Sequence, residues 1–334
     1  MRMEGNQTPV VSVILPFYNA PGLEQAIKSI LNQTFWSFEL ILIDNASTDA
    51  SSEVAKKYAD EYPHVRMITE PNKGVVFAAN RGISEAKGEY VMRMDADDTS
   101  FPERMQLQVA YLEKHSEVAG VSGLVEYVGY NVNKGFRLYV DWLNSIDTPE
   151  KIYLNQFVEF PVANPTLMFR KAVFDEVGLF HDGAFPEDYE FFLRVMQHQL
   201  KISKVSVPVL RWFDSEHRLT RSDERYSQEA FFRVKAKYLA TWLSNHNPFH
   251  PHVYLWAGGR VSRKRGSYLI DQGIRIRKYI DVVQRKDSIH FQDTPEPSVG
   301  FIVSYVANRG ARDEIRTFLE QKGFVEGENF IIAS

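Results

Sequence analysis

The first half of the chain alternates short apolar runs with segments whose apolar residues recur at helical spacing. Four runs rich in β-branched residues predict strands at 10–16, 38–44, 65–69 and 89–94. Three intervening segments predict helices at 23–32, 50–61 and 75–86. Because strands and helices alternate, the pattern predicts an α/β fold in which helices cover both faces of a parallel sheet.

The pattern loosens after Gly123. Aromatic-rich runs predict strands at 125–130 and 136–140. Helices are expected near 148–157, from Pro186 onward and over 226–244.

The segment "NHNPFHPH", residues 245–252, contains two prolines and predicts a domain boundary. A second α/β pattern follows, with strands in "VYLWAGGR", "FIVSYVA" and "NFIIA" and a helix in "ARDEIRTFLEQKG". We therefore predict one large domain over 1–244 and a small α/β domain over 253–334.

Composition excludes several classes of protein. The formal net charge of -4 gives no reason to expect a nucleic-acid partner. The chain has no cysteine, which excludes disulfides, thiolate nucleophiles and cysteine-bound metals. The start "MRMEGNQTPVV" lacks an apolar core of signal-peptide length, and no apolar run is long enough to span a bilayer. These features predict a cytoplasmic protein that is at most peripheral to the inner face of the membrane.

Three carboxylates, Asp95, Asp97 and Asp98, directly follow the fourth predicted strand. Open α/β sheets bind ligands at the carboxyl ends of their strands, so this triplet is expected at a ligand-binding edge. Crowded carboxylates repel one another, and a divalent cation such as Mg²⁺ or Mn²⁺, shared with the phosphates of a ligand, would relieve the repulsion. The alternative is that Asp98 or Thr99 caps the helix expected at 103–112, which leaves the other two aspartates unexplained.

Several stretches together resemble the family 2 glycosyltransferases, which have the GT-A fold. The nucleotide-sugar half of that family is similar to "SVILPFYN", "AIKSILNQTFWSFELILIDNASTD", "NKGVVFAANRGISEAKGEYVMRMDADD" and "FPERMQLQVAYLE". The acceptor half is similar to "NPTLMFRKAVFDEVGLF" and "PEDYEFFLRV". The resemblance runs from about residue 10 to about residue 243. It implies a mixed, mostly parallel sheet, with a nucleotide-binding part over 1–123 and an acceptor part over 124–244.

The resemblance also implies the reaction, which is inverting transfer of a sugar from a UDP- or dTDP-sugar to an acceptor hydroxyl. Such enzymes use Mn²⁺ or Mg²⁺, and they act on saccharides or lipid-linked saccharides in surface polysaccharide or glycolipid synthesis. Asp95-Ala96-Asp97 falls on the Asp-x-Asp motif of the family. Asp97 is thereby the implied metal ligand and Asp95 lies near the ribose, whereas the role of Asp98 is less fixed.

Four residues fall where the family holds the base and ribose: Pro16, Tyr18, Asp44 and Asn45. Tyr18 can stack on a base, although a packed loop aromatic is the alternative, and Asp44 can accept a hydrogen bond. Family members often have a second Asp where this chain has Asn45, whose carbonyl can still accept from an imide N–H. Lys73, in "NKG", lies in a loop where a cation could meet base or phosphate, or simply be solvated.

On the acceptor side, Glu187-Asp188 matches the Glu-Asp pair of the family. The resemblance implies that Asp188 is the catalytic base and Glu187 its acceptor-side neighbour. Otherwise both would only complement the dipole at a helix start. His217 lies where family members place a residue that reaches the metal or diphosphate, with Arg218 and Arg221 as alternatives.

The segment 260–286 contains nine Arg or Lys residues against Asp271 and Asp281. A patch of this kind is either a solvated face or a contact for an anionic partner, such as a membrane surface or a lipid diphosphate. The sequence argues against two other functions for the whole chain. A sugar-1-phosphate nucleotidyltransferase would need a Gly-rich basic loop that "PFYNAPGLEQ" does not provide. A nucleotide-binding module without turnover would have no need of both Asp97 and Asp188.

Overall fold

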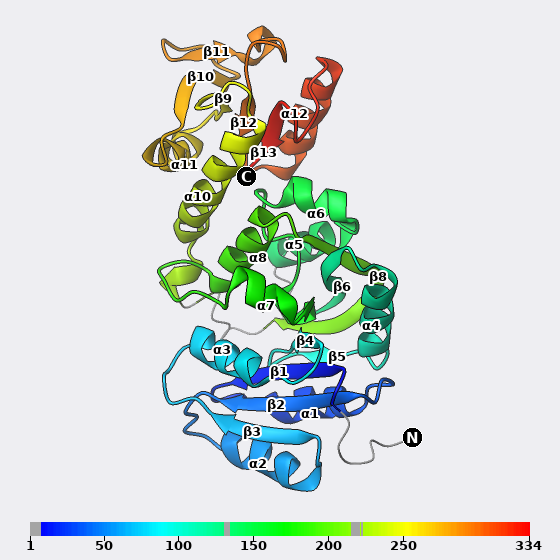
Figure 1. Cartoon of the computed structure of the whole chain (residues 1–334). Coiled ribbons are helices and arrows are strands. Elements are labelled where there is room, and N and C mark those ends of the chain that lie inside the picture. The colour runs from blue at the N-terminus through cyan, green and yellow to red at the C-terminus, as the bar shows by residue number, and fades with distance from the viewer. Residues whose placement is uncertain (1–7, 130–133, 215–220, 222) are drawn as a thin grey trace. The chain divides into compact units, whose positions relative to one another are not determined.

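The computed structural model describes residues 8–129, 134–214, 221 and 223–334. They form two compact units (Figure 1). The first unit takes in the chain up to residue 152 together with 162–182 and 198–221, and the second takes in 153–161, 183–197 and 222–334. The two domains predicted from the sequence, over 1–244 and 253–334, remain a prediction.

The first unit is built on an eight-stranded sheet with the order β3-β2-β1-β4-β7-β6-β8-β5. Its first four strands are parallel: β1 (Val11–Phe17), β2 (Phe38–Asp44), β3 (Val65–Thr69) and β4 (Tyr90–Arg93). They are connected by α1 (Leu23–Leu31), α2 (Ser51–Glu61) and α3 (Val75–Glu85). These seven elements confirm the predicted alternation. The strand order reverses between β1 and β4, and sheets of this kind bind ligands at such a point.

Helices cover both faces of these parallel strands. On one face, Leu15 of β1 belongs to the same buried cluster as Ile27 of α1 and Tyr58 of α2. Successive strand residues point to opposite faces, so Ile14 faces the other way, toward α3. There Gly82 comes so close that a Cβ on it would lie 3.0 Å from Ile14 Cγ2. A strand buried on both faces explains why β1 is apolar along almost its whole length.

The second half of the sheet is mixed. The strand β7 (Met168–Arg170) runs antiparallel to β4 and to β6 (Val118–Gly129). In turn β6 is parallel to β8 (Lys201–Asp214), and the short β5 (Thr99–Ser100) is antiparallel to β8. The remaining elements of this part are α4 (Arg104–Lys114), α5 (Lys134–Ser145), α6 (Pro149–Asn155), the 3₁₀ turn η1 (Asn164–Thr166) and α7 (Ala172–Val177). The sheet is therefore mixed and mostly parallel, as expected.

The strand predicted at 136–140 is wrong, because these residues lie in α5. Apolar residues there alternate over a short stretch, which favours a strand. The sequence also places Phe136, Tyr139, Val140 and Leu143 at helical spacing, and the structure buries Val140 and Leu143. The segment forms a helix because the helical spacing continues past residue 140, whereas the alternation does not. The helical spacing gives α5 a complete apolar face.

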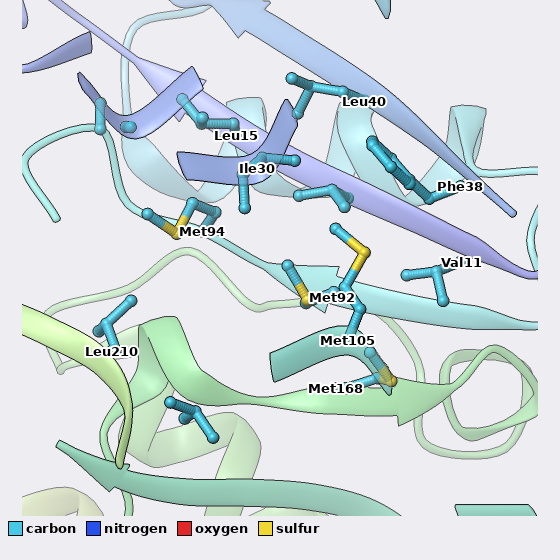
Figure 2. Packing of buried hydrophobic residues seen from close by; sticks show 14 of the residues in the cluster. Val11, Leu15, Ile30, Phe38, Leu40, Met92, Met94, Met105, Met168 and Leu210 are labelled. Carbon is cyan, nitrogen blue, oxygen red and sulfur yellow. The ribbon is translucent and has the colours of Figure 1, made fainter. Parts of the chain in front are cut away.

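Methionines fill much of the core beneath the carboxyl end of β4. Met92, Met94, Met105 and Met168 have no exposed surface and come from β4, the residue after it, α4 and β7. Figure 2 shows Met92 beside Met105 and Met168, with Met94 nearer Leu15. Unbranched methionine side chains fit irregular gaps, which suits a place where parallel and antiparallel strands meet.

The second unit contains α8 (Glu187–Gln197), the 3₁₀ turn η2 (Glu224–Tyr226), α10 (Gln228–His246) and a five-stranded parallel sheet. The sheet strands are β9 (His252–Trp256), β10 (Arg275–Asp281), β11 (Ser288–His290), β12 (Ile302–Ser304) and β13 (Phe330–Ile332), in the order β11-β10-β9-β12-β13. They are accompanied by α11 (Arg260–Asp271), the 3₁₀ turn η3 (Phe291–Asp293) and α12 (Arg309–Gln321). The C-terminal residues are therefore an α/β module, as predicted.

Throughout the described residues, no helix combines the length and the apolar character that crossing a bilayer requires.

Candidate active site

The three carboxylates after β4 occupy three different environments. Asp95 accepts a hydrogen bond from Arg93 Nε at 2.8 Å and is partly exposed. Asp98 is buried, and its Oδ1 accepts from the backbone N–H of Phe213 at 2.9 Å. Asp97, between them, is exposed. The structure therefore distinguishes the residues of the triplet, and Asp97 is the exposed one.

The alternative role of Asp98 as a helix cap is not what the structure shows. The N-cap of α4 is Glu103, and no side chain caps this helix end. Asp98 instead holds Phe213, near the end of β8, while Thr99 pairs with Arg211 of the same strand. Asp98 thus fastens the chain after the triplet to β8.

Arg104 is a buried cation next to the triplet, and our sequence analysis did not identify it. Its side chain has no exposed surface, and it donates to the carbonyl oxygen of Arg93 at 2.9 Å and to Gln108 at 3.0 Å. Burial lowers the pKa of the Arg104 guanidinium to about 9, and the carboxylates of Asp98 and Asp95 oppose that shift. Both Arg93 and Arg104 lie in the same stretch as the aspartates, so the local charge balance was visible in the sequence.

Gly22, at the N-cap of α1, contacts the backbone of the Asp-x-Asp motif. A Cβ on this residue would lie 3.0 Å from the carbonyl oxygen of Ala96 and 3.3 Å from the Cα of Asp97. Backbone atoms cannot move aside as a flexible side chain can. The glycine therefore lets the loop after β1 and the motif after β4 approach each other at the edge of the sheet.

Tyr18 and Lys73 lie together at this edge of the sheet. Tyr18 follows β1 and is 49% exposed. The ammonium of Lys73 lies 5.1 Å from the centre of its ring. Pro16, two residues earlier, is half-buried and pairs with Ile43 of β2. An exposed aromatic face beside a cation can receive a base and an anionic group.

Asp44 and Asn45 are buried, and each makes several hydrogen bonds within the protein. Asp44 accepts from the N–H of Ser47 at 2.9 Å and from the hydroxyl of Ser52.

The amide of Asn45 bonds to the backbone of the loop 70–74. It donates to the carbonyl oxygens of Glu70 and Asn72, at 3.1 and 2.7 Å, and accepts from the N–H of Gly74 at 2.7 Å. An Asp at this position could not donate to those two carbonyls. Asn45 therefore holds the loop that contains Lys73.

Two residues other than glycine have a positive φ at this edge: Asn19 at 45° and Ala46 at 61°. Asn19 is accommodated by its side chain, which accepts from Thr48 N–H at 2.8 Å. Its backbone N–H also donates to Ser47 Oγ at 3.1 Å. Ala46, in the loop after β2, has no polar side chain to compensate, so its backbone is strained.

The Glu-Asp pair begins α8, in the second unit. Glu187 is buried, and its Oε2 accepts from the hydroxyl of Tyr226 at 2.7 Å. Asp188 is partly exposed and accepts from the N–H of Tyr189 at 2.7 Å. Of the two carboxylates, Asp188 is the more accessible to a substrate.

His217 and Arg218 lie outside the described residues. Arg221 is described, and its guanidinium pairs with Asp214 of β8. Among the residues that the structure describes, no three His, Asp or Glu side chains gather as a set of metal ligands. Magnesium commonly takes only one or two protein carboxylates, with phosphates and water completing its shell. The exposed Asp97, with the partly exposed Asp95 two residues away, fits a metal held in that way.

The architecture of the chain is that of GT-A proteins. TarS of S. aureus, solved with UDP-GlcNAc, matches it with a TM-score of 0.52, covering 70% of this chain and 66% of that one. The mannosyltransferase PcManGT of Pyrobaculum calidifontis, solved with GDP-Man and Mn²⁺, matches with a TM-score of 0.50, covering 72% and 64%. Both are 20% identical to this chain, so the likeness concerns the fold.

The sequence model of Glycosyl transferase family 2 matches residues 12–178, half of the chain, and the protein belongs to this family. The uncharacterized glycosyltransferase MJ1057 of Methanocaldococcus jannaschii is 26% identical over 260 residues, which cover 74% of this chain and 84% of MJ1057. EpsE of Bacillus subtilis is 44% identical over 125 residues, or 36% of this chain. The match spans 45% of the length of EpsE, less than half of that relative.

The strain at Ala46 generates a stability prediction. Replacing Ala46 by Gly should raise the free energy of unfolding by about 0.5–1 kcal/mol, because glycine adopts positive φ without the steric cost that alanine incurs. Urea unfolding measures the change. Ala59→Gly, inside α2, is the matched control and should lower stability by about 1 kcal/mol. Equal destabilisation by both variants would show that Ala46 is not strained.

Proposed function

We propose that this protein is an inverting glycosyltransferase that moves a sugar from a nucleoside diphosphate donor to an acceptor hydroxyl. The observation that carries the proposal is the exposed side chain of Asp97, directly after the carboxyl end of β4, in a chain of this family. That TarS and PcManGT were solved with nucleotide sugars supports the donor class. The proposed donor is a UDP- or dTDP-sugar, with a hexose as the transferred group.

In this proposal the donor binds at the carboxyl ends of β1, β2 and β4. Tyr18 stacks on the base, Lys73 lies near the base or diphosphate, and Asp95 lies on the nucleoside side. Asp44 and Asn45 shape the base pocket, the latter through its hold on loop 70–74. Asp97, with His217 as a second proposed ligand, would hold Mn²⁺ or Mg²⁺, which when bound supplies positive charge to the departing diphosphate.

The proposed reaction is a single displacement. The acceptor hydroxyl oxygen forms a bond to the anomeric carbon, and the bond from that carbon to the diphosphate oxygen breaks. The hydroxyl proton passes to the carboxylate of Asp188, and the nucleoside diphosphate leaves with the bonding electrons. Because attack occurs opposite the leaving group, the anomeric configuration inverts. The acceptor is proposed to be a saccharide or a lipid-linked saccharide in polysaccharide or glycolipid synthesis.

Asp97→Asn should abolish the stabilisation of the protein by UDP or dTDP with Mn²⁺, since an amide is a poorer ligand for a hard cation. A thermal-shift panel of UDP-, dTDP- and GDP-sugars, with and without Mn²⁺, measures this and identifies the donor. Asp60→Asn, on the exposed side of α2, controls for the lost charge and should respond as the wild type does. An undiminished shift in Asp97→Asn would remove Asp97 from the metal site.

Asp188→Asn should retain donor binding and lose transfer by roughly a hundredfold or more, because only the proton acceptor is removed. Release of nucleoside diphosphate, measured with the donor that the panel identifies, gives the rate. Asp175→Asn, an exposed aspartate of α7, should keep the wild-type rate. If Asp188→Asn turned over at the wild-type rate, another residue would be the base.

We also propose that the segment 260–286 contacts an anionic membrane surface. Three exposed valines support this. Val282 and Val283, directly after β10, are 68% and 52% exposed, and Val261, in the first turn of the helix α11 that follows the neighbouring strand β9, is 58% exposed. The exposed side chain of Arg260 adjoins Val261 at the start of α11, and that of Lys286 lies in the loop that contains Val282 and Val283. Apolar side chains flanked by cations suit the interface of an anionic bilayer.

Not all of the basic side chains contribute to that surface. Arg285 pairs with Asp281 at 2.9 Å, Arg263 with Asp287 at 2.6 Å and Lys264 with Glu229 at 2.9 Å. The charge available to a bilayer is therefore smaller than the composition of the segment indicates. Contact should depend on the valines as well as on the charge.

Sedimentation with vesicles of phosphatidylserine and phosphatidylcholine at low salt tests the contact. Replacing Val282 and Val283 by Ser should reduce the bound fraction several-fold, because roughly 1 kcal/mol of apolar burial is lost per valine. The matched control replaces Val299 and Val325, which are 46% and 48% exposed elsewhere in the module, and should bind as the wild type does. Wild-type protein that stays in the supernatant would refute the contact.

A further inference from the structure

Two tyrosine hydroxyls donate to two glutamates of α8. Tyr226, the last residue of η2, donates to Oε2 of Glu187 at 2.7 Å. Tyr238, three turns along α10, donates to Oε1 of Glu190. All four residues belong to the second unit, and both glutamates are buried. The two bonds are chemically alike and lie one helical turn apart on α8, yet their surroundings differ.

Glu190 is part of an ion pair, and its position is held from two sides. Arg194 donates to it through Nη2 at 3.0 Å and through Nε at 3.2 Å. A carboxylate held by a guanidinium keeps its charge and orientation even when one further donor is lost. The hydroxyl of Tyr238 therefore adds to a contact that Arg194 already secures.

Glu187 is placed differently, next to the proposed base. Its neighbour Asp188 is partly exposed, so the two carboxylates share the first turn of α8 with one buried and one accessible. Burial raises the pKa of the Tyr226 phenol, and the charges of Asp188 and Glu187 raise it further. Tyr226 thus remains a hydrogen-bond donor throughout the working pH range.

We infer that Tyr226 is a positioning residue for the proposed base: its hydroxyl holds the buried Glu187 carboxylate and thereby fixes the start of α8 on which Asp188 is presented. The inference rests on the proposed function. A buried carboxylate needs donors to retain one orientation, and a helix start is the part of a helix that frays most easily. Misplacement of a catalytic group by about 1 Å can lower a rate up to a hundredfold.

The test compares Tyr226→Phe with Tyr238→Phe, because each removes one hydroxyl that donates to a glutamate of α8. Rates of transfer, KM for the donor and the melting temperature are measured for both variants and the wild type. We expect Tyr226→Phe to lower kcat at least tenfold with an unchanged donor KM, and Tyr238→Phe to keep the wild-type kcat. Both should melt at similar temperatures, slightly below the wild type.

Other outcomes separate the inference from the function beneath it. If the wild type transfers sugar and Tyr226→Phe has the wild-type kcat, the inference is wrong. The hydrogen bond from Tyr226 to Glu187 then only connects α8 to the chain before α10. If both variants lose kcat in proportion to their loss of stability, a structural role again explains the data. If the wild type releases no nucleoside diphosphate from any donor of the panel, the proposed glycosyl transfer fails instead. Should Tyr226→Phe fail to fold, Glu187→Leu, which removes the acceptor of the Tyr226 hydroxyl, must show the same loss of kcat for the inference to stand.

Discussion

Three like charges within four residues, at the end of a buried strand, are the constraint around which the first unit is organised. Their repulsion has to be balanced inside the protein before any ligand arrives. Arg93 binds Asp95, the positive charge of the buried Arg104 lies near Asp95 and Asp98, and the backbone N–H of Phe213 donates to Oδ1 of Asp98. These contacts join β4, α4 and β8 at one place. Asp97 is the exposed member of the triplet.

The same edge of the sheet depends on short connections between loops that are distant in sequence. Asn45 ties the end of β2 to loop 70–74, and Asn19 ties the end of β1 to the loop after β2. Gly22 allows the start of α1 to contact the motif after β4. Loops fastened in this way lose less conformational entropy when a ligand binds, which is how a rigid scaffold presents a binding site. Ala46 keeps a strained backbone, which is typical of a residue whose conformation is fixed by the contacts around it.

The two carboxylate clusters follow one physical rule. In each, a buried carboxylate is held by a donor, Asp98 by Phe213 N–H and Glu187 by Tyr226, next to a more exposed carboxylate that is proposed to act. A buried charge is tolerated only when it is hydrogen-bonded, so the held residue can serve as a fixed anchor. The exposed neighbour keeps its charge and its access to substrate. Separate residues can therefore provide rigidity and reactivity within one short stretch of chain.

The sequence by itself determined the α/β alternation, because the periods of strand and helix are local properties of the chain. It also determined the candidate residues at strand ends and the family resemblance. It was ambiguous at 136–140, where both periods occur, and it left α11 and β10 unrecognised because their many charges obscure the apolar pattern. Only the tertiary structure decided that Asn45 holds a loop, that Asp98 fastens β8 and that Tyr226 holds Glu187. Their partners lie between 25 and 115 residues away along the chain, and only folding brings such distant groups within hydrogen-bond distance.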